Sequence, residues 1–221
     1  FLLSGFCFLL FATPSLRAAE RGDSNPAVSP HAQVRPVALN EVHWTVGCWA
    51  DRFELCRQRT VPALWSIMEG TNYSQFYQNF RIAAGLTKGR HRGATIKDAD
   101  SYKWLESACA VLAAAPDPEL VGRIEDVIAV IAKAQRADGY IHTPILIAER
   151  QGTATVKPFQ DPLQFEMYNL GHLFTAACVY HRVTGRTNLL AVACKAADFL
   201  EATFRQPTPE LPSSTICPSH Y

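Results

Sequence analysis

The feature that most constrains the fold is a series of amphipathic helical segments joined in pairs by short turns. Residues 98–114 and 117–137 carry apolar residues at helical spacing, and residues 166–182 and 188–204 do the same. A short polar or Gly-containing turn separates the two members of each pair. Two helices joined in this way form an antiparallel αα-hairpin. We therefore expect an all-α chain built from successive αα-hairpins.

The hairpins can stack as a solenoid or close as a toroid. No motif recurs at a fixed period, which disfavours a solenoid. In a toroid of paired helices the long connections lie at one end and carry ligand groups, as loops on rigid scaffolds often do. Residues 78–97, 139–164 and 206–221 are the long connections here. The sequence predicts that they converge.

Three further segments have weaker patterns. Residues 34–46 alternate in a way that predicts a short strand or extended segment. Residues 49–69 have helical spacing that Pro62 is expected to kink or split. Residues 141–163 have no helical period, so we expect a long loop or a small hairpin there.

The N-terminal residues are typical of an export signal. Residues 1–12 are apolar and uncharged, about the length of a signal-peptide core, and small residues follow. We expect a truncated signal peptide over residues 1–19, a flexible leader over 20–33 and the N-terminal part of a catalytic domain over 34–221. A buried N-terminal helix and a membrane anchor are the alternatives to the signal peptide. Secretion, or export to the periplasm, would follow from it, and the apolar end at Tyr221 favours a chain cut within a domain.

Charge and motif content exclude several classes of protein. Twenty-one Lys and Arg against 20 Asp and Glu give a net charge of +1, without the basic stripe of a nucleic-acid binder or a polybasic membrane binder. The sequence contains no phosphate-binding Gly loop, nucleophile-elbow Ser or zincin motif. Nucleotide-dependent enzymes, serine hydrolases and zincins are therefore disfavoured.

Three pairs of residues are candidates for chemistry. Tyr168 and His172 are four residues apart on one helix face, where they can contact a sugar ring and its hydroxyls or simply pack in the core. Asp98 and Asp100 are either a carboxylate pair of the kind that glycosidases use or, for one of them, a helix cap. A Cys217-x-x-His220 pair has zinc-binding side chains, but two ligands do not make a zinc site.

An ordered series of motifs resembles one enzyme family. Its members here are Asn79-Phe80-Arg81-Ile82-Ala83-Ala84-Gly85, the segment from Asp98 to Glu106, Pro116-Asp117-Pro118-Glu119-Leu120, the segment from Ala134 to Thr143, Glu166-Met167-Tyr168-Asn169-Leu170-Gly171-His172 and Thr184-Gly185. Together they resemble the N-terminal part of glycoside hydrolase family 127, the β-L-arabinofuranosidase family. The resemblance runs from about residue 34 to residue 221.

This resemblance implies a fold and an activity. The fold would be an (α/α)6 barrel, of which this chain is an incomplete N-terminal portion, and the activity would be retaining hydrolysis of a terminal L-arabinofuranose from a glycan. The family's nucleophile is a Cys bound to zinc, with a Glu as general acid/base. The resemblance places the Glu, the Cys and the zinc ligands beyond residue 221, so no catalytic or metal-binding residue is expected in this chain. The implied partner is a carbohydrate; the oligomeric state is left open.

The resemblance also implies which residues of this chain contact the substrate. His220 falls where the family has a sugar-contacting His, His172 matches the His of a Gly-His pair near the pocket, and Asp98 and Asp100 match paired acids. With Tyr168 these are the expected substrate-binding residues. Phe165 stands where well-known members have His, which implies a sibling specificity for a different furanose or pyranose.

Two other functions remain open from the residues themselves. One is a different α/α-toroid carbohydrate enzyme, such as an unsaturated glycuronyl hydrolase or a polysaccharide lyase, which needs no zinc-bound Cys. The other is a carbohydrate-binding or scaffolding helical protein without catalysis.

Overall fold

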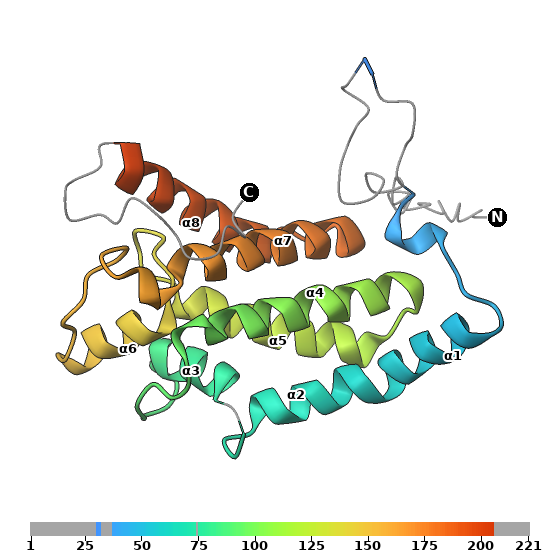
Figure 1. The fold of residues 1–221 in the computed structure, drawn as a ribbon, viewed down its shortest axis with the longest axis horizontal. Coiled ribbons are helices and arrows are strands. Elements are labelled where there is room, and N and C mark those ends of the chain that lie inside the picture. Colours follow the sequence, from blue (N-terminus) through green and yellow to red (C-terminus); the bar gives the residue numbers. More distant parts are fainter. Residues whose placement is uncertain (1–29, 32–36, 74, 206–221) are drawn as a thin grey trace, which may run out of the picture.

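The computed structural model describes residues 30–31, 37–73 and 75–205 (Figure 1). The expected signal peptide at residues 1–19 lies outside the described residues, and so does nearly all of the leader. Cys217 and His220 also lie outside them.

The described residues form helices and connecting turns, and contain no strand. In chain order the elements are η2 (Leu39–Glu41), α1 (Cys48–Leu55), η3 (Cys56–Thr60), α2 (Val61–Glu69), α3 (Phe76–Ala83), η4 (Thr95–Lys97), α4 (Asp98–Ala114), α5 (Pro118–Ala134), α6 (Thr143–Gln151), η5 (Pro162–Gln164), α7 (Glu166–Thr184) and α8 (Asn188–Arg205).

The two expected αα-hairpins are confirmed as α4–α5 and α7–α8. Helix α5 begins as the sequence indicates, because the Asp117 side chain accepts hydrogen bonds from the Glu119 and Leu120 amides and Pro118 occupies the first turn. Helix α7 ends at Gly185, whose φ of 71° is the left-handed conformation that glycine adopts without strain. Local capping chemistry therefore sets these boundaries.

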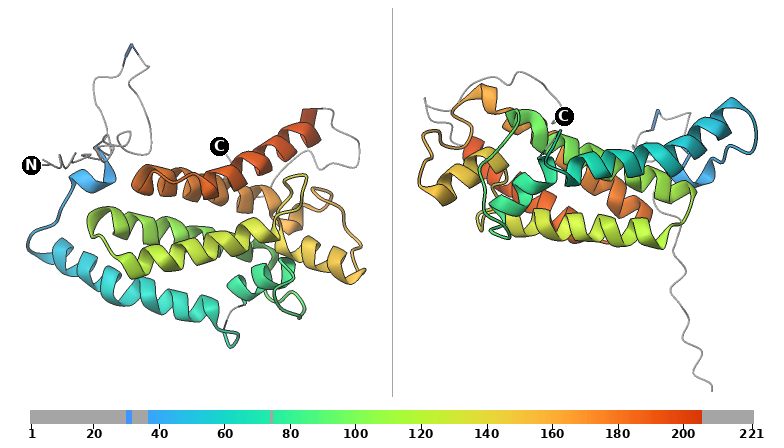
Figure 2. Two further views of the ribbon diagram at one scale, coloured as in Figure 1. Left: turned by 180° about the vertical axis from the view of Figure 1, so that it is seen from behind. Right: turned by 90° about the horizontal axis from the view of Figure 1, so that it is seen from below.

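Helices α4 and α7 lie side by side and run in the same direction, and their contact is the most extensive between any two of the described elements (Figure 1). Each hairpin partner returns antiparallel, so α8 packs on α7 and α5 lies behind α4 (Figure 2). Helices α2 and α3 cover the other side of α4. The core between these layers is apolar and continuous. Because α4 and α7 are parallel, both begin at the same end of the molecule.

Three expectations for the less regular segments are resolved by the structure. Of the two alternatives for residues 34–46, a short strand is wrong for the described residues 37–46, where a 3-10 turn, η2, lies. The extended alternative holds on both sides of η2, where Ala38 and Val42 have extended backbone. Residues 141–163 are not all loop, because α6 lies within them. The long first helix is split as expected: a π-helical turn, η3, precedes Pro62 and separates α1 from α2.

Candidate functional site

The starts of α4 and α7 are joined directly by hydrogen bonds. Asn169 in the first turn of α7 accepts a hydrogen bond from the Ala99 amide of α4 at 3.0 Å, and its amide nitrogen donates to the Thr95 carbonyl at 2.9 Å. Asn169 is buried and its bond to the Ala99 amide is shielded from water, whereas Thr95 is partly exposed. The Asn169 side chain thus pairs with a backbone amide in the first turn of α4, 70 residues away in sequence.

Asp98 joins α4 to the start of α6. Its carboxylate is buried and accepts hydrogen bonds from the Thr143 amide at 2.7 Å and the Thr143 hydroxyl at 2.5 Å. The His142 ring, also buried, has Nδ1 3.5 Å from the same carboxylate. The prediction that Asp98 or Asp100 caps α4 is wrong: Asp98 is the first residue of α4 and its side chain bonds the first amide of α6 instead. We refer to Asp98, Thr143, Asn169 and Glu166 as the helix-start network.

Glu166 fixes the loop that enters α7. Its buried carboxylate accepts the Tyr140 hydroxyl at 2.5 Å and the Phe159 amide at 2.8 Å. Burial raises the pKa of Glu166, and its hydrogen bonds and the nearby His142 oppose that rise. Residues 159–165 are therefore held at one end by Glu166 and, further along, by the Thr95 hydroxyl, which donates to the Leu163 carbonyl at 2.6 Å.

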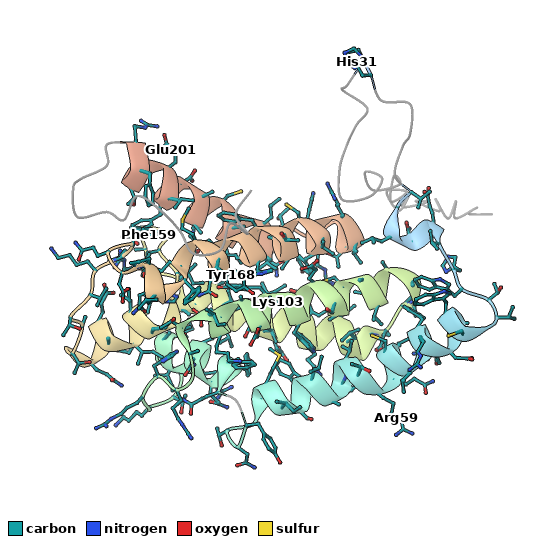
Figure 3. The ribbon with its side chains drawn as sticks, viewed as in Figure 1. His31, Arg59, Lys103, Phe159, Tyr168 and Glu201 are labelled. Carbon is teal, nitrogen blue, oxygen red and sulfur yellow. The ribbon has the colours of Figure 1, made fainter. Side chains whose placement is uncertain are left out.

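Beside this network lies a partly accessible set of polar and aromatic side chains. The Lys103 ammonium of α4 donates to the Tyr168 hydroxyl of α7 at 2.6 Å and lies 3.5 Å from Asp100 (Figure 3). The Tyr168 and His172 rings meet edge to face, with centroids 4.7 Å apart. We call Asp100, Lys103, Tyr168 and His172 the polar row.

These contacts determine the charge states and ion pairs within the polar row. Burial, and then the charge of Lys103, lowers the pKa of His172. Its imidazole is thus favoured in the neutral form, in which one nitrogen donates and the other accepts a hydrogen bond. Asp100 is balanced by Lys103 and by Lys97, whose ammonium lies 3.2 Å away. The row therefore offers donors, acceptors and ring faces within one small area.

The structure brings together some of the predicted substrate-binding residues and separates others. Asp100, Tyr168 and His172 fall in the polar row. Asp98 is turned inward, with its side chain only 2% exposed, so the two aspartates do not form a carboxylate pair. His220 lies outside the described residues. Sequence reasoning missed Lys103, although its position three residues after Asp100 places it on the same helix face.

The described residues do not fit a zinc ion. No three His, Cys, Asp or Glu side chains among them are close enough to hold a metal. No step through zinc is therefore assigned to these residues.

The other end of α4 and α7 contains a separate hollow. It measures about 380 Å³ and is lined by residues that include Leu39, Leu112, Val121 and Val183. None of the predicted site residues contributes to it. Among the described helices, none is long and apolar enough to cross a membrane.

Known proteins resemble this chain in sequence and in fold. The family description "β-L-arabinofuranosidase, GH127 catalytic domain" matches residues 41–221. A non-reducing end β-L-arabinofuranosidase of Bifidobacterium longum subsp. longum is 34% identical over 174 residues, which cover 71% of this chain and 26% of that protein. The chain thus spans about a quarter of the length of that curated relative.

Solved structures give the same result. The GH127 β-L-arabinofuranosidase Ara127N from Geobacillus stearothermophilus T6 has a TM-score of 0.69 and 31% identity, covering 77% of this chain and 27% of that one. A second GH127 β-arabinofuranosidase has a TM-score of 0.67 and 29% identity, covering 80% and 28%. The predicted all-α fold class is confirmed, with the paired helices arranged as part of an α/α toroid. By its sequence match over residues 41–221, the chain belongs to glycoside hydrolase family 127.

Proposed function

We propose that this chain belongs to a glycoside hydrolase that releases a terminal sugar, L-arabinofuranose or a close relative, from a glycan with retention of configuration. Family membership supports the reaction class, and the similarity to proteins described as β-L-arabinofuranosidases supports the sugar. The observation that carries the proposal is the polar row, where partly buried rings and hydrogen-bonding groups lie together on the starts of two packed helices.

Within this proposal the described residues bind the sugar. Tyr168 and His172 offer ring edges and faces to its C–H groups, and Lys103 and Asp100 hydrogen-bond its hydroxyls. His220 is a further substrate-binding residue, assigned by resemblance alone. Asp98 supports the site through Thr143 without touching the sugar.

Catalysis is assigned to residues outside this chain. The family resemblance implies a general acid/base Glu and a zinc-bound Cys nucleophile, both beyond residue 221. Zinc would hold that Cys as a thiolate and set its geometry. Within the proposal, this chain's own residues position the sugar.

Export is also part of the proposal. The apolar residues 1–12, followed by small residues, favour a cleaved signal peptide and a secreted or periplasmic enzyme. N-terminal sequencing of the protein purified from its native source tests this point. A mature N-terminus near residue 20 is expected, and retention of residues 1–19 would contradict it.

Hydrolysis by the whole gene product tests the proposed activity. The coding sequence is extended beyond Tyr221 and the complete protein is assayed with p-nitrophenyl β-L-arabinofuranoside. Proton NMR of the first product gives its anomeric configuration. Release of β-L-arabinofuranose is expected. Absence of turnover on arabinofuranosides and related glycosides, with sugar binding intact, would instead favour a carbohydrate-binding role.

A further inference from the structure

A groove beside α5, on the side of α2 and α3, takes no part in the proposed site. Two adjoining hollows, of about 200 and 700 Å³, share Trp65, Glu119 and Arg123 in their linings and together form this groove. Seen from behind, α2 runs below α5, and the groove lies between them (Figure 2). No residue of the polar row or of the helix-start network lines either hollow. The larger hollow has the size of a ligand cleft. We call the two hollows the α2–α5 groove.

A buried hydrogen-bond donor in the lining of this groove has no partner. Trp65 is only 6% exposed and lines both hollows, and its indole Nε1 makes no hydrogen bond to any described residue. The neighbouring Trp104 is paired in the usual way, because its Nε1 donates to the Val61 carbonyl at 3.1 Å. Buried polar groups in native proteins are nearly always hydrogen-bonded. Since an indole N–H can only donate, Trp65 requires an acceptor that the described residues do not supply.

The floor of the groove contains a glycine that the stability of α5 does not explain. Gly122 lies within α5, where glycine is less favourable than any other residue except proline. A Cβ at this position would meet no atom within 4 Å, so no neighbouring group requires its absence. Asp126 and Ala129 follow at i+4 and i+7 on the same helix face and also line the groove. The missing side chain at residue 122 leaves the α5 backbone open to a ligand.

The charges around the larger hollow indicate an uncharged, hydroxyl-rich ligand. Two arginines and three acids line it: Arg81, Arg123, Glu69, Glu119 and Asp126. Arg123 is also paired with Glu119 at 3.4 Å. Such a nearly balanced set does not create the strong field that attracts a nucleic acid or another highly charged partner. It does offer both donors and acceptors to hydroxyl groups, which is the chemistry of a chain of sugars.

We propose that the α2–α5 groove binds a stretch of the glycan chain, separately from the sugar that the polar row holds. The Trp65 N–H donates to an oxygen of the glycan, and Gly122 lets a sugar ring approach α5. Arg123, whose guanidinium lies 5.5 Å over the Trp65 ring, covers the indole and turns aside on binding because its side chain is partly exposed. This inference rests on the proposed function, since it takes the substrate to be a glycan, and adds to it a second binding site.

Affinity electrophoresis of the whole gene product in gels that contain soluble arabinan measures this binding. Methyl β-L-arabinofuranoside is added to occupy the polar row. The original protein should be retarded as the arabinan concentration rises. Gly122→Gln, which fills the groove, should abolish the retardation and leave the thermal midpoint unchanged or higher, since Gln favours a helix more than Gly does. Ala132→Gln is the matched control: it places the same side chain at an exposed position of α5 outside the groove and should be retarded like the original.

Trp65→Phe removes the unpaired donor and keeps an aromatic ring in its place. Loss of one hydrogen bond should weaken the binding of arabinan about two- to tenfold. Equal retardation of the original protein, Gly122→Gln and Trp65→Phe would overturn the proposal, and so would the absence of retardation in the original. A lower thermal midpoint in Gly122→Gln would also overturn it, because another part of the folded protein would then fill the groove.

Hydrolysis of p-nitrophenyl β-L-arabinofuranoside separates this inference from the proposed function. Gly122→Gln should hydrolyse this small substrate as fast as the original protein does, because the groove lies apart from the polar row. Hydrolysis without retardation that depends on Gly122 would refute the groove alone. Retardation that depends on Gly122, without hydrolysis, would refute the proposed function alone.

Discussion

Removing the Asp98 carboxylate tests whether the helix-start network holds the fold together. In Asp98→Ala the Thr143 amide and hydroxyl both lose their acceptor. Thr143 is completely buried, so water cannot replace it. Each hydrogen bond to a charged group contributes about 1.5–3 kcal/mol, and a buried donor left unpaired costs a similar amount. We expect a loss of about 3–5 kcal/mol in the free energy of unfolding.

Asp117→Ala is the matched control. Asp117 also accepts two hydrogen bonds, from the Glu119 and Leu120 amides, but it does so at the accessible start of its own helix. Loss of such a cap costs about 1 kcal/mol because water reaches the freed amides. The same chemical change is thus made in a buried contact between distant segments and in an accessible local one.

Urea unfolding followed by circular dichroism at 222 nm compares the two variants with the original chain. A domain of this size is stable by about 5–15 kcal/mol, so Asp98→Ala should remain folded or nearly so in water. The slope of the free energy of unfolding against urea concentration should be the same in both variants if only their stability differs. A cost for Asp98→Ala equal to or below that of Asp117→Ala would refute the importance we give to the network.

Three further measurements test other parts of the structure. Burial raises the pKa of Glu166, so the folded chain binds the proton of this carboxyl more tightly than the unfolded chain does. The thermal midpoint should therefore fall as the pH rises above 4.5, the ordinary pKa of this carboxyl. In Glu166→Gln this decline should be smaller. Lys103→Gln should raise the pKa of His172 in an NMR titration, since burial remains but the repelling charge is gone, and an unchanged pKa would argue against their proximity. Gly139→Ala should destabilise strongly, because its Cβ would lie 2.1 Å from a backbone oxygen of α8, whereas Gly152→Ala, at a positive φ of 67° but with open space around it, should cost far less.

The sequence predicts the helices that carry their own signals. Residues 118–134 have an Asp-Pro start and a regular apolar stripe, so both the existence and the start of α5 follow from local chemistry. Helix α6 was not predicted because its first amide is capped by Asp98, 45 residues earlier in the chain. A periodicity argument cannot detect a cap that comes from elsewhere in the fold.

In the candidate site, too, the sequence predicts the features that depend on local spacing and misses those that depend on distant packing. The position of Tyr168 and His172 on one helix face follows from their spacing, and the structure brings their rings into contact. The inward orientation of Asp98 depends on where α6 packs, which spacing does not reveal. The left-handed backbone of Phe165, with a φ of 56°, is equally invisible in the sequence, because this conformation is common only for Gly, Asn and Asp.

The helix-start network and the polar row have different tolerances to change, and this follows from their burial. Asp98 and Asn169 join segments that are far apart in sequence, and Glu166 joins Tyr140 to the loop before α7. All three side chains are buried, so a substitution there disturbs stability and the position of the row together. The row side chains are partly accessible and can exchange a lost contact for water. A substitution in the row can therefore be accommodated with a smaller loss of stability. The buried network, in contrast, loses stability with each of its hydrogen bonds, because water cannot replace the lost partner.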